Sequence, residues 1–126
     1  MNEKILVTED SVITKRQLID ILNENGYTNI IEAANGTDAV DKYMRENPDL
    51  VLLDLMMKKM EDPKALDGLE ALKKIMDIDM NAKVIIISAI GQQSVVNECM
   101  KVGARKHIVK PIDEDTVIRE IREVLG

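Results

Sequence analysis

The sequence predicts an α/β fold in which a five-stranded parallel sheet, with strand order 2-1-3-4-5, is covered on both faces by five helices. Two observations indicate this class. Five short apolar segments alternate with five longer amphipathic segments, and polar residues gather where the apolar segments end. Such alternation favours right-handed crossovers, which build a parallel sheet between two helix layers. No repeat or linker interrupts the 126 residues, so we expect one domain over residues 1–126.

The predicted strands are short runs rich in Val, Ile and Leu, and they cover residues 4–8, 29–34, 49–54, 82–88 and 106–110. The predicted helices have apolar residues at helical spacing and polar residues at their starts. They cover residues 11–26, 35–47, 67–77 and 92–103, and a last helix follows Asp113. Asn35 and Asp67 are each followed three residues later by an acid, which is the spacing of a capping box or its variant.

The composition excludes several classes of protein. The net charge of −6 argues against a protein that grips the phosphates of nucleic acids. The apolar runs are too short for a membrane span, and a strand pattern begins at once, so we expect no signal peptide. The single cysteine, Cys99, cannot form an internal disulfide, which fits a cytoplasmic location. The 45% of hydrophobic residues predicts a packed core, in which Cys99 takes part.

Polar residues stand where four of the predicted strands end. Glu9 and Asp10 follow the first strand, Asp54 ends the third, Ser88 ends the fourth and Lys110 ends the fifth. The second strand ends in alanines, which places it at an edge of the sheet, away from these residues. Ligands of open α/β sheets bind at the carboxyl ends of the strands. The sequence therefore predicts that three acids, a hydroxyl and an ammonium group converge there.

Three acids in one place need a cation. Two carboxylates ~5 Å apart repel by about 3 kcal/mol at an effective dielectric constant of ~20. The ligands here are hard oxygens, with neither a second histidine nor a cysteine cluster, and this chemistry suits Mg²⁺. A carboxylate beside Mg²⁺ and a lysine can attack phosphorus. We therefore expect Asp54 to be a nucleophile at a magnesium site.

Five segments carry a resemblance to a known family: "ILVTEDS", "DLVLLDLMM", "DGLEAL", "VIIISA" and "GARKHIVKP". In order and spacing they resemble the receiver domain of two-component response regulators, over essentially the whole chain. The resemblance is to the stand-alone chemotaxis type, which is CheY-like. The departures in the connection between Asp54 and Asp67, described below, favour an archaeal variant of the family. It implies the flavodoxin-like, CheY-like form of the predicted fold.

The resemblance implies a role for each polar strand end. Asp54 accepts a phosphoryl group, Ser88 is the switch hydroxyl that turns toward it, and Lys110 pairs with it. Glu9 and Asp10 hold Mg²⁺ together with Asp54. The backbone carbonyl of Met56 is a further metal ligand, and Pro111 often follows the lysine through a cis bond.

The resemblance also implies partners. A CheA-like histidine kinase donates the phosphoryl group, a motor switch protein or motor adaptor receives the signal, and a phosphatase is a third partner. The signal passes through the face formed by residues 92–103, 106–110 and the last helix. Such a domain is monomeric and is no enzyme, because it catalyses only its own phosphorylation and dephosphorylation.

Three features depart from the family pattern. His107 stands where the family has a switch aromatic residue, and we expect a partly buried, hydrogen-bonded imidazole there. Lys58 replaces a proline, and the connection to Asp67 is longer than usual, which can alter the choice of partner. Met56 and Ile90 are bulky at positions that influence access of water to the phosphoryl group, which predicts slow hydrolysis.

Other readings stay open at this point. The protein can be a phosphorelay intermediate that passes its phosphoryl group to another histidine protein. It can be a phosphatase of the haloacid dehalogenase kind, although Met56 stands where that class has its second acid. It can also be a scaffold that takes no phosphate, against which the intact polar set argues. Glu9 and Asp10 can serve merely as helix caps, and Ser88 can be an ordinary exposed hydroxyl.

Overall fold

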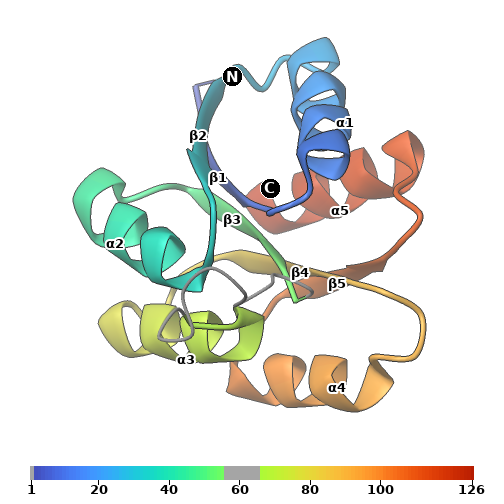
Figure 1. Ribbon diagram of the computed structural model, residues 1–126. Helices are drawn as coiled ribbons and strands as arrows, with labels where there is room; N and C mark the ends of the chain where they lie inside the picture. Colours follow the sequence, from blue (N-terminus) through green and yellow to red (C-terminus); the bar gives the residue numbers. More distant parts are fainter. Residues whose placement is uncertain (1, 56–65) are drawn as a thin grey trace.

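The computed structural model describes residues 2–55 and 66–126 and shows the predicted α/β sandwich (Figure 1). Its strands are β1 (Lys4–Thr8), β2 (Asn29–Ala33), β3 (Leu50–Asp54), β4 (Val84–Ser88) and β5 (Lys106–Val109). Its helices are α1 (Val12–Glu24), α2 (Gly36–Glu46), α3 (Gly68–Ile78), α4 (Gln93–Val102) and α5 (Glu114–Leu125). All strand pairs are parallel, and the order β2-β1-β3-β4-β5 confirms the predicted topology.

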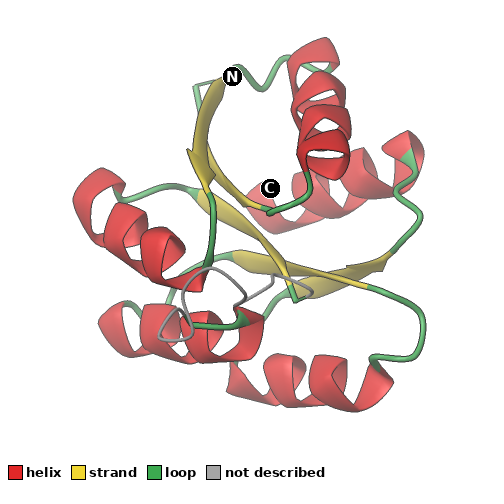
Figure 2. Cartoon of the chain, viewed as in Figure 1, coloured by secondary structure: helices red, strands yellow, loops and turns green. Residues whose placement is uncertain are grey.

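The sheet separates two layers of helices, with α1 and α5 on one face and α2, α3 and α4 on the other (Figure 2). Successive residues of the central strands point to opposite faces. Thus Val51 and Leu53 of β3 pack with α2 and α3, whereas Leu50 and Leu52 pack with α1 and α5. Because β3 is buried on both faces, all five of its residues are buried, Asp54 included.

None of the helices in the described residues combines the length and the apolar character that crossing a bilayer requires.

Side chains cap the starts of four helices. Asp67 and Glu70 form the full capping box that their spacing predicts at α3. At α2, the side chain of Asn35 accepts a hydrogen bond from the backbone of Asp38, whose carboxylate accepts one from Ala34. These contacts satisfy backbone N–H groups that have no partner within the helix.

The start of α3 packs closely against the end of β3. A Cβ atom at Gly68 would lie 2.9 Å from the Cα atom of Leu55 and 3.0 Å from the carbonyl oxygen of Asp54. Only glycine allows this approach of two backbones. Gly68 therefore contributes to fixing the position of the β3 end, and with it the carboxylate of Asp54.

Candidate functional site at the carboxyl edge of the sheet

The predicted polar residues meet at the carboxyl edge of the sheet. Glu9 directly follows β1, Asp54 is the last residue of β3, and Ser88 is the last residue of β4. The backbone joins the neighbouring strand ends, because Leu55 N donates to Ile87 O over 2.9 Å and Lys110 N donates to Ser88 O over 2.7 Å. The regular hydrogen bonding of the parallel sheet thus holds side chains from distant parts of the sequence together.

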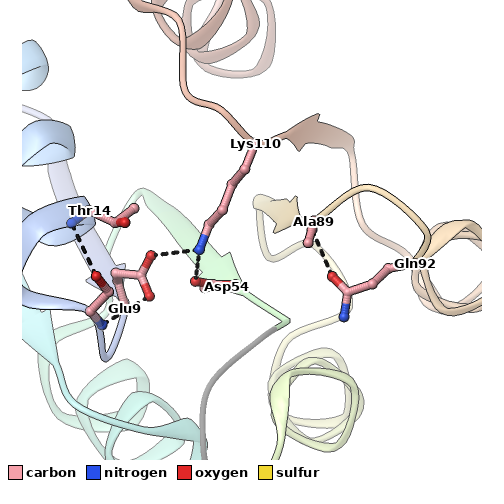
Figure 3. A network of polar contacts seen from close by, with 7 residues as sticks. Glu9, Thr14, Asp54, Ala89, Gln92 and Lys110 are labelled. Atoms are coloured by element: carbon pink, nitrogen blue, oxygen red, sulfur yellow. Dashed lines mark hydrogen bonds and ion pairs between the residues drawn. The ribbon is translucent and has the colours of Figure 1, made fainter.

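One ammonium group serves two buried carboxylates (Figure 3). Lys110 Nζ lies 2.7 Å from Asp54 Oδ2 and 3.1 Å from Glu9 Oε1. The side chains of both acids are 0% exposed, whereas that of Lys110 is 26% exposed. A buried carboxylate is costly without a partner. Lys110 compensates for one of the two negative charges and leaves the site acidic.

Asp10 completes an acidic cluster. One carboxylate oxygen each from Glu9, Asp10 and Asp54 lies within 4.8 Å of the other two. Asp10 is half-buried, unlike Glu9 and Asp54, so it is the member of the cluster that solvent reaches. Three converging hard oxygen donors, two of them buried with a single lysine, are the donor set that suits Mg²⁺, which binds through a few carboxylates and keeps several waters.

The crowding of these charges appears in their pKa values. The pKa of Glu9 is raised from 4.5 to about 7. Burial is the largest cause, and the hydrogen bond and the charge of Asp54 act in the same direction. For Lys110, burial lowers the pKa, but the hydrogen bonds and charges of Asp54 and Glu9 outweigh this effect and raise it overall. Lys110 therefore stays an ammonium ion, and Glu9 is the group that takes up a proton when no further cation is present.

Two buried hydroxyl groups border the acids. Ser88 and Thr8 are each 1% exposed, and neither hydroxyl oxygen has a hydrogen-bond partner among the described residues. The reading of Ser88 as an ordinary exposed hydroxyl is therefore wrong. Thr8 escaped the sequence analysis, although the signal was present: it is a polar residue at the end of β1, directly before Glu9. Unpaired buried hydroxyls are uncommon in proteins and indicate sites where a ligand supplies the missing bonds.

Comparison with known proteins identifies the family. The family model of the response regulator receiver domain matches residues 5–122. Chemotaxis protein CheY of Bacillus subtilis is 41% identical over 126 residues, which are the whole of both chains. The chain belongs to the response regulator receiver family. Sporulation initiation phosphotransferase F of Bacillus subtilis is 38% identical over 125 residues, 99% of this chain and 95% of that protein.

A solved structure supports the same assignment. The crystal structure of the CheX–CheY–BeF₃–Mg²⁺ complex from Borrelia burgdorferi matches with a TM-score of 0.86 and 41% identity, covering 98% of this chain and 90% of that one. The chain is thus a receiver domain of the CheY type used in chemotaxis response regulators. Receiver domains are signalling domains rather than classical enzymes, and they generally bind Mg²⁺ at an acidic pocket.

His107 differs from the sequence expectation. We expected a partly buried imidazole, but His107 is exposed in this receiver, and none of the described residues makes a hydrogen bond with its side chain. The physical reason is the position of its strand. Because β5 is short and lies at the edge of the sheet, the helices do not cover the face of β5 that carries His107. Val109, two residues on and hence on the same face, is 43% exposed.

Other sequence predictions have mixed outcomes. Ser11, and neither Glu9 nor Asp10, is the N-cap of α1, although Glu9 Oε2 accepts a hydrogen bond from Ser11 N over 3.3 Å. The bond between Lys110 and Pro111 is cis, as the family resemblance implies. Cys99 is buried in the core. Met56, with its carbonyl group, and Lys58 lie in residues 56–65, outside the described residues.

Proposed function

We propose that this receiver is a phosphorylation-activated signalling switch of a chemotaxis system. Asp54 accepts a phosphoryl group from a histidine kinase of the CheA kind, and the modified domain signals to a motor switch protein or a motor adaptor. One observation carries the proposal: the buried Asp54 carboxylate lies 2.7 Å from Lys110 Nζ and within 4.8 Å of the oxygens of two further acids. This arrangement places a nucleophile, a fixed cation and a set of metal ligands together.

Glu9, Asp10 and Asp54 are the side chains that would hold Mg²⁺, and the family resemblance adds the Met56 carbonyl. Their combined charge exceeds that of Lys110, so a divalent cation is electrostatically favoured. When bound, Mg²⁺ supplies charge neutralisation for the phosphoryl oxygens. The raised pKa of Glu9, about 7, means that the metal and a proton compete for this carboxylate.

The chemical step follows from the groups that are present. A carboxylate oxygen of Asp54 attacks phosphorus, the bond from phosphorus to the kinase histidine nitrogen breaks, and its electron pair stays on the imidazole. No general base is needed, because an ionised carboxylate is already a nucleophile. Lys110 Nζ is a hydrogen-bond donor fixed at 2.7 Å from the attacking group, where it neutralises charge that develops on the phosphoryl oxygens.

The rim of the site is suited to a protein donor. Val12 and Ile13, just after Asp10, are 78% and 75% exposed, and Ile90, two residues after Ser88, is 83% exposed. Large exposed aliphatic side chains around a charged centre are typical of a docking surface. They support a phosphodonor that is itself a protein, such as a kinase domain, and a kinase partner implies a cytoplasmic location.

The output face in this proposal consists of α4, β5 and α5. Its exposed members include His107 and Val109 on β5. Lys106 Nζ joins β5 to α5 through Glu123 Oε2 at 2.8 Å, so strand and helix present one joined surface. Ser88, whose hydroxyl has no partner among the described residues, connects the phosphorylation site to this face by turning toward the phosphoryl group. The CheX–CheY complex of Borrelia burgdorferi supports a further protein partner, which we propose to be a phosphatase of this monomeric switch.

A second function has specific support. Sporulation initiation phosphotransferase F is 38% identical to this chain over nearly its whole length. The same site in a phosphorelay intermediate would pass its phosphoryl group on to a histidine of another protein. Labelled phosphate that moves from the phosphorylated domain to such a protein would favour the relay over the motor switch.

The decisive experiment is a titration of the protein with beryllofluoride and Mg²⁺, followed by NMR. We expect saturable shifts at Ser88, at His107 and along α4 in the wild type, and none of them in Asp54→Ala. A pull-down with and without beryllofluoride then tests for the motor or adaptor partner. A wild-type spectrum that beryllofluoride and Mg²⁺ leave unchanged would rule out the switch.

A further inference from the structure

The connection between β4 and α4 is closed by a side chain. Gln92 Oε1 accepts a hydrogen bond from Ala89 N over 2.8 Å (Figure 3). In addition, Gln92 N donates to Ala89 O over 3.3 Å. Gly91 between them has a φ of +96°, a conformation that glycine adopts without strain. Residues 89–92 thus form a small ring with two hydrogen bonds, which we call the β4–α4 ring.

This use of Gln92 costs the helix a cap. Gln92 stands at the N-cap position of α4, but its side chain bonds backward to Ala89 and forms no capping bond with the helix. The side chains of the residues that precede the other four helices do cap them, namely Ser11, Asn35, Asp67 and Asp113. The backward bond therefore stabilises the loop instead of the helix start.

The ring adjoins the phosphorylation site. Ala89 directly follows Ser88, whose hydroxyl is buried and has no hydrogen-bond partner among the described residues. Ser88 O accepts the backbone bond of Lys110, and Leu55 N, next to Asp54, donates to Ile87 O. The donors at the carboxyl end of β4 are therefore the Ser88 hydroxyl and the Ala89 amide, and the amide is already bonded to Gln92.

A phosphoryl group on Asp54 brings three strongly accepting oxygens to this edge. Lys110 is one donor already within reach of the carboxylate, at 2.7 Å. Among the described residues, the end of the neighbouring strand β4 offers two further donors, namely the Ser88 hydroxyl, which has no hydrogen-bond partner there, and Ala89 N–H, which is bonded to Gln92. Charged phosphoryl oxygens are stronger acceptors than a neutral amide oxygen, so the new ligand can draw Ala89 N–H away.

We propose that Gln92 is a positioning residue that acts as a latch: its amide oxygen holds the β4–α4 ring closed in the unmodified protein and competes with the phosphoryl oxygens for Ala89 N–H. The latch sets the equilibrium between the resting and the activated loop. This inference rests on the proposed function, because it assigns a regulatory residue to that site. By linkage, removing an interaction made only in the resting state tightens binding of the activating ligand.

The test compares Gln92→Leu, which has a side chain of similar bulk but no hydrogen-bond acceptor, with wild type and with Gln93→Ala. Gln93 is the matched control, since its Nε2 bonds to Asn97 Oδ1 at 2.9 Å on the outside of α4 and leaves the ring alone. Each protein is titrated with beryllofluoride at saturating Mg²⁺, and separately with Mg²⁺ alone. One net hydrogen bond corresponds to a change in affinity of about 2- to 10-fold.

We expect Gln92→Leu to bind beryllofluoride about 2- to 10-fold more tightly than wild type, with unchanged affinity for Mg²⁺ alone and faster hydrogen exchange of the Ala89 amide before ligand is added. Gln93→Ala should match wild type in all three measurements. Equal or weaker beryllofluoride binding by Gln92→Leu would overturn the latch while leaving the proposed function intact. Failure of wild type itself to bind beryllofluoride would overturn both.

A measurement on the wild type alone guards against a variant that does not fold. Saturation with beryllofluoride and Mg²⁺ should shift the Ala89 amide signal and the side-chain NH₂ signals of Gln92, because their mutual bond is exchanged for others. The NH₂ signals of Gln93 should stay in place. If the ligand binds and the Gln92 signals do not move, the latch is excluded.

Discussion

The two ends of the sheet treat charge in opposite ways. At the amino end, Lys4 N donates to Asp49 Oδ2 over 2.8 Å and Lys4 Nζ lies 3.4 Å from Glu46 Oε1, with solvent reaching these side chains. At the carboxyl end, Glu9 and Asp54 are 0% exposed and share one lysine. At the amino end Lys4 thus pairs with Asp49 and Glu46 in contact with solvent, whereas the carboxyl end keeps an excess of negative charge away from water.

This difference shows where the molecule gives up stability for function. Repulsion between Glu9 and Asp54 and the two unbonded hydroxyls of Thr8 and Ser88 all lie at one end of the sheet. A cation and a phosphoryl group supply the charge and the acceptors that this end lacks, so binding energy replaces interactions that the fold leaves unmade. Local rules of stability are typically broken at functional sites for this reason.

The largest effect should come from Asp54→Asn. The amide is no nucleophile, so phosphorylation by a kinase or a small phosphodonor should fall by more than about 100-fold. Without Mg²⁺ the variant should be more stable than wild type, with a free energy of unfolding higher by on the order of 1 kcal/mol, because Lys110 then faces a single buried carboxylate. Incorporation of labelled phosphate and urea titration measure the two effects.

Asp49→Asn at the amino end is the matched control for this substitution. It also removes a negative charge from a carboxylate that accepts a hydrogen bond, in this case from Lys4 N. It should leave phosphorylation unchanged and should not raise stability. If Asp49→Asn and Asp54→Asn changed phosphorylation and stability in the same way, the proposed difference between the two ends of the sheet would be wrong.

The next effect in size is the dependence of stability on pH. The pKa of Glu9 rises from 4.5 to about 7 on folding, chiefly through burial. Between these values the folded protein binds a proton that the unfolded chain has released, so stability should fall as the pH rises through this window, by at most about 3 kcal/mol. Below the window the folded state keeps the full stability of the protonated form.

Glu9→Gln should remove this slope, and Mg²⁺ should reduce it in wild type by stabilising the ionised carboxylate. Urea unfolding in EDTA at a series of pH values, repeated with Mg²⁺, measures both. A wild-type slope that survives in Glu9→Gln would assign the titration to another group.

Sequence reasoning placed the site residues but missed how they contact one another. Strand ends could be predicted because parallel strands place their carboxyl ends at one edge, which fixed Asp54, Ser88 and Lys110 in space. The exposure of His107 could not, because it depends on how far α4 covers an edge strand. The backward bond of Gln92 has no pattern in the sequence, since glutamine is no usual cap and the bond arises only once the turn has formed.

A smaller effect is expected for Tyr43→Phe, toward the amino end. Tyr43 is buried, and its hydroxyl donates to Asp79 Oδ2 over 3.0 Å, which joins α2 to the end of α3. Loss of this bond should cost about 1 kcal/mol in urea unfolding. Burial and the adjacent Asp79 raise the pKa of Tyr43 to about 12, so wild-type stability should also decline above pH 10, and the variant should lack that decline. Beryllofluoride affinity should stay at the wild-type value.

The smallest effect is expected for Lys4→Met, which removes a partly exposed ion pair with Glu46 and a bond to the Glu46 carbonyl. Such pairs contribute less than about 1 kcal/mol, and salt screens them. The difference in unfolding free energy between variant and wild type should therefore shrink from low to high ionic strength, while the pH slope caused by Glu9 persists, because its carboxylate is buried beyond the reach of mobile ions. Equal salt sensitivity of the two quantities would mean that water and ions enter the carboxyl end freely, and the distinction between a solvated end and a buried, charged end would fail.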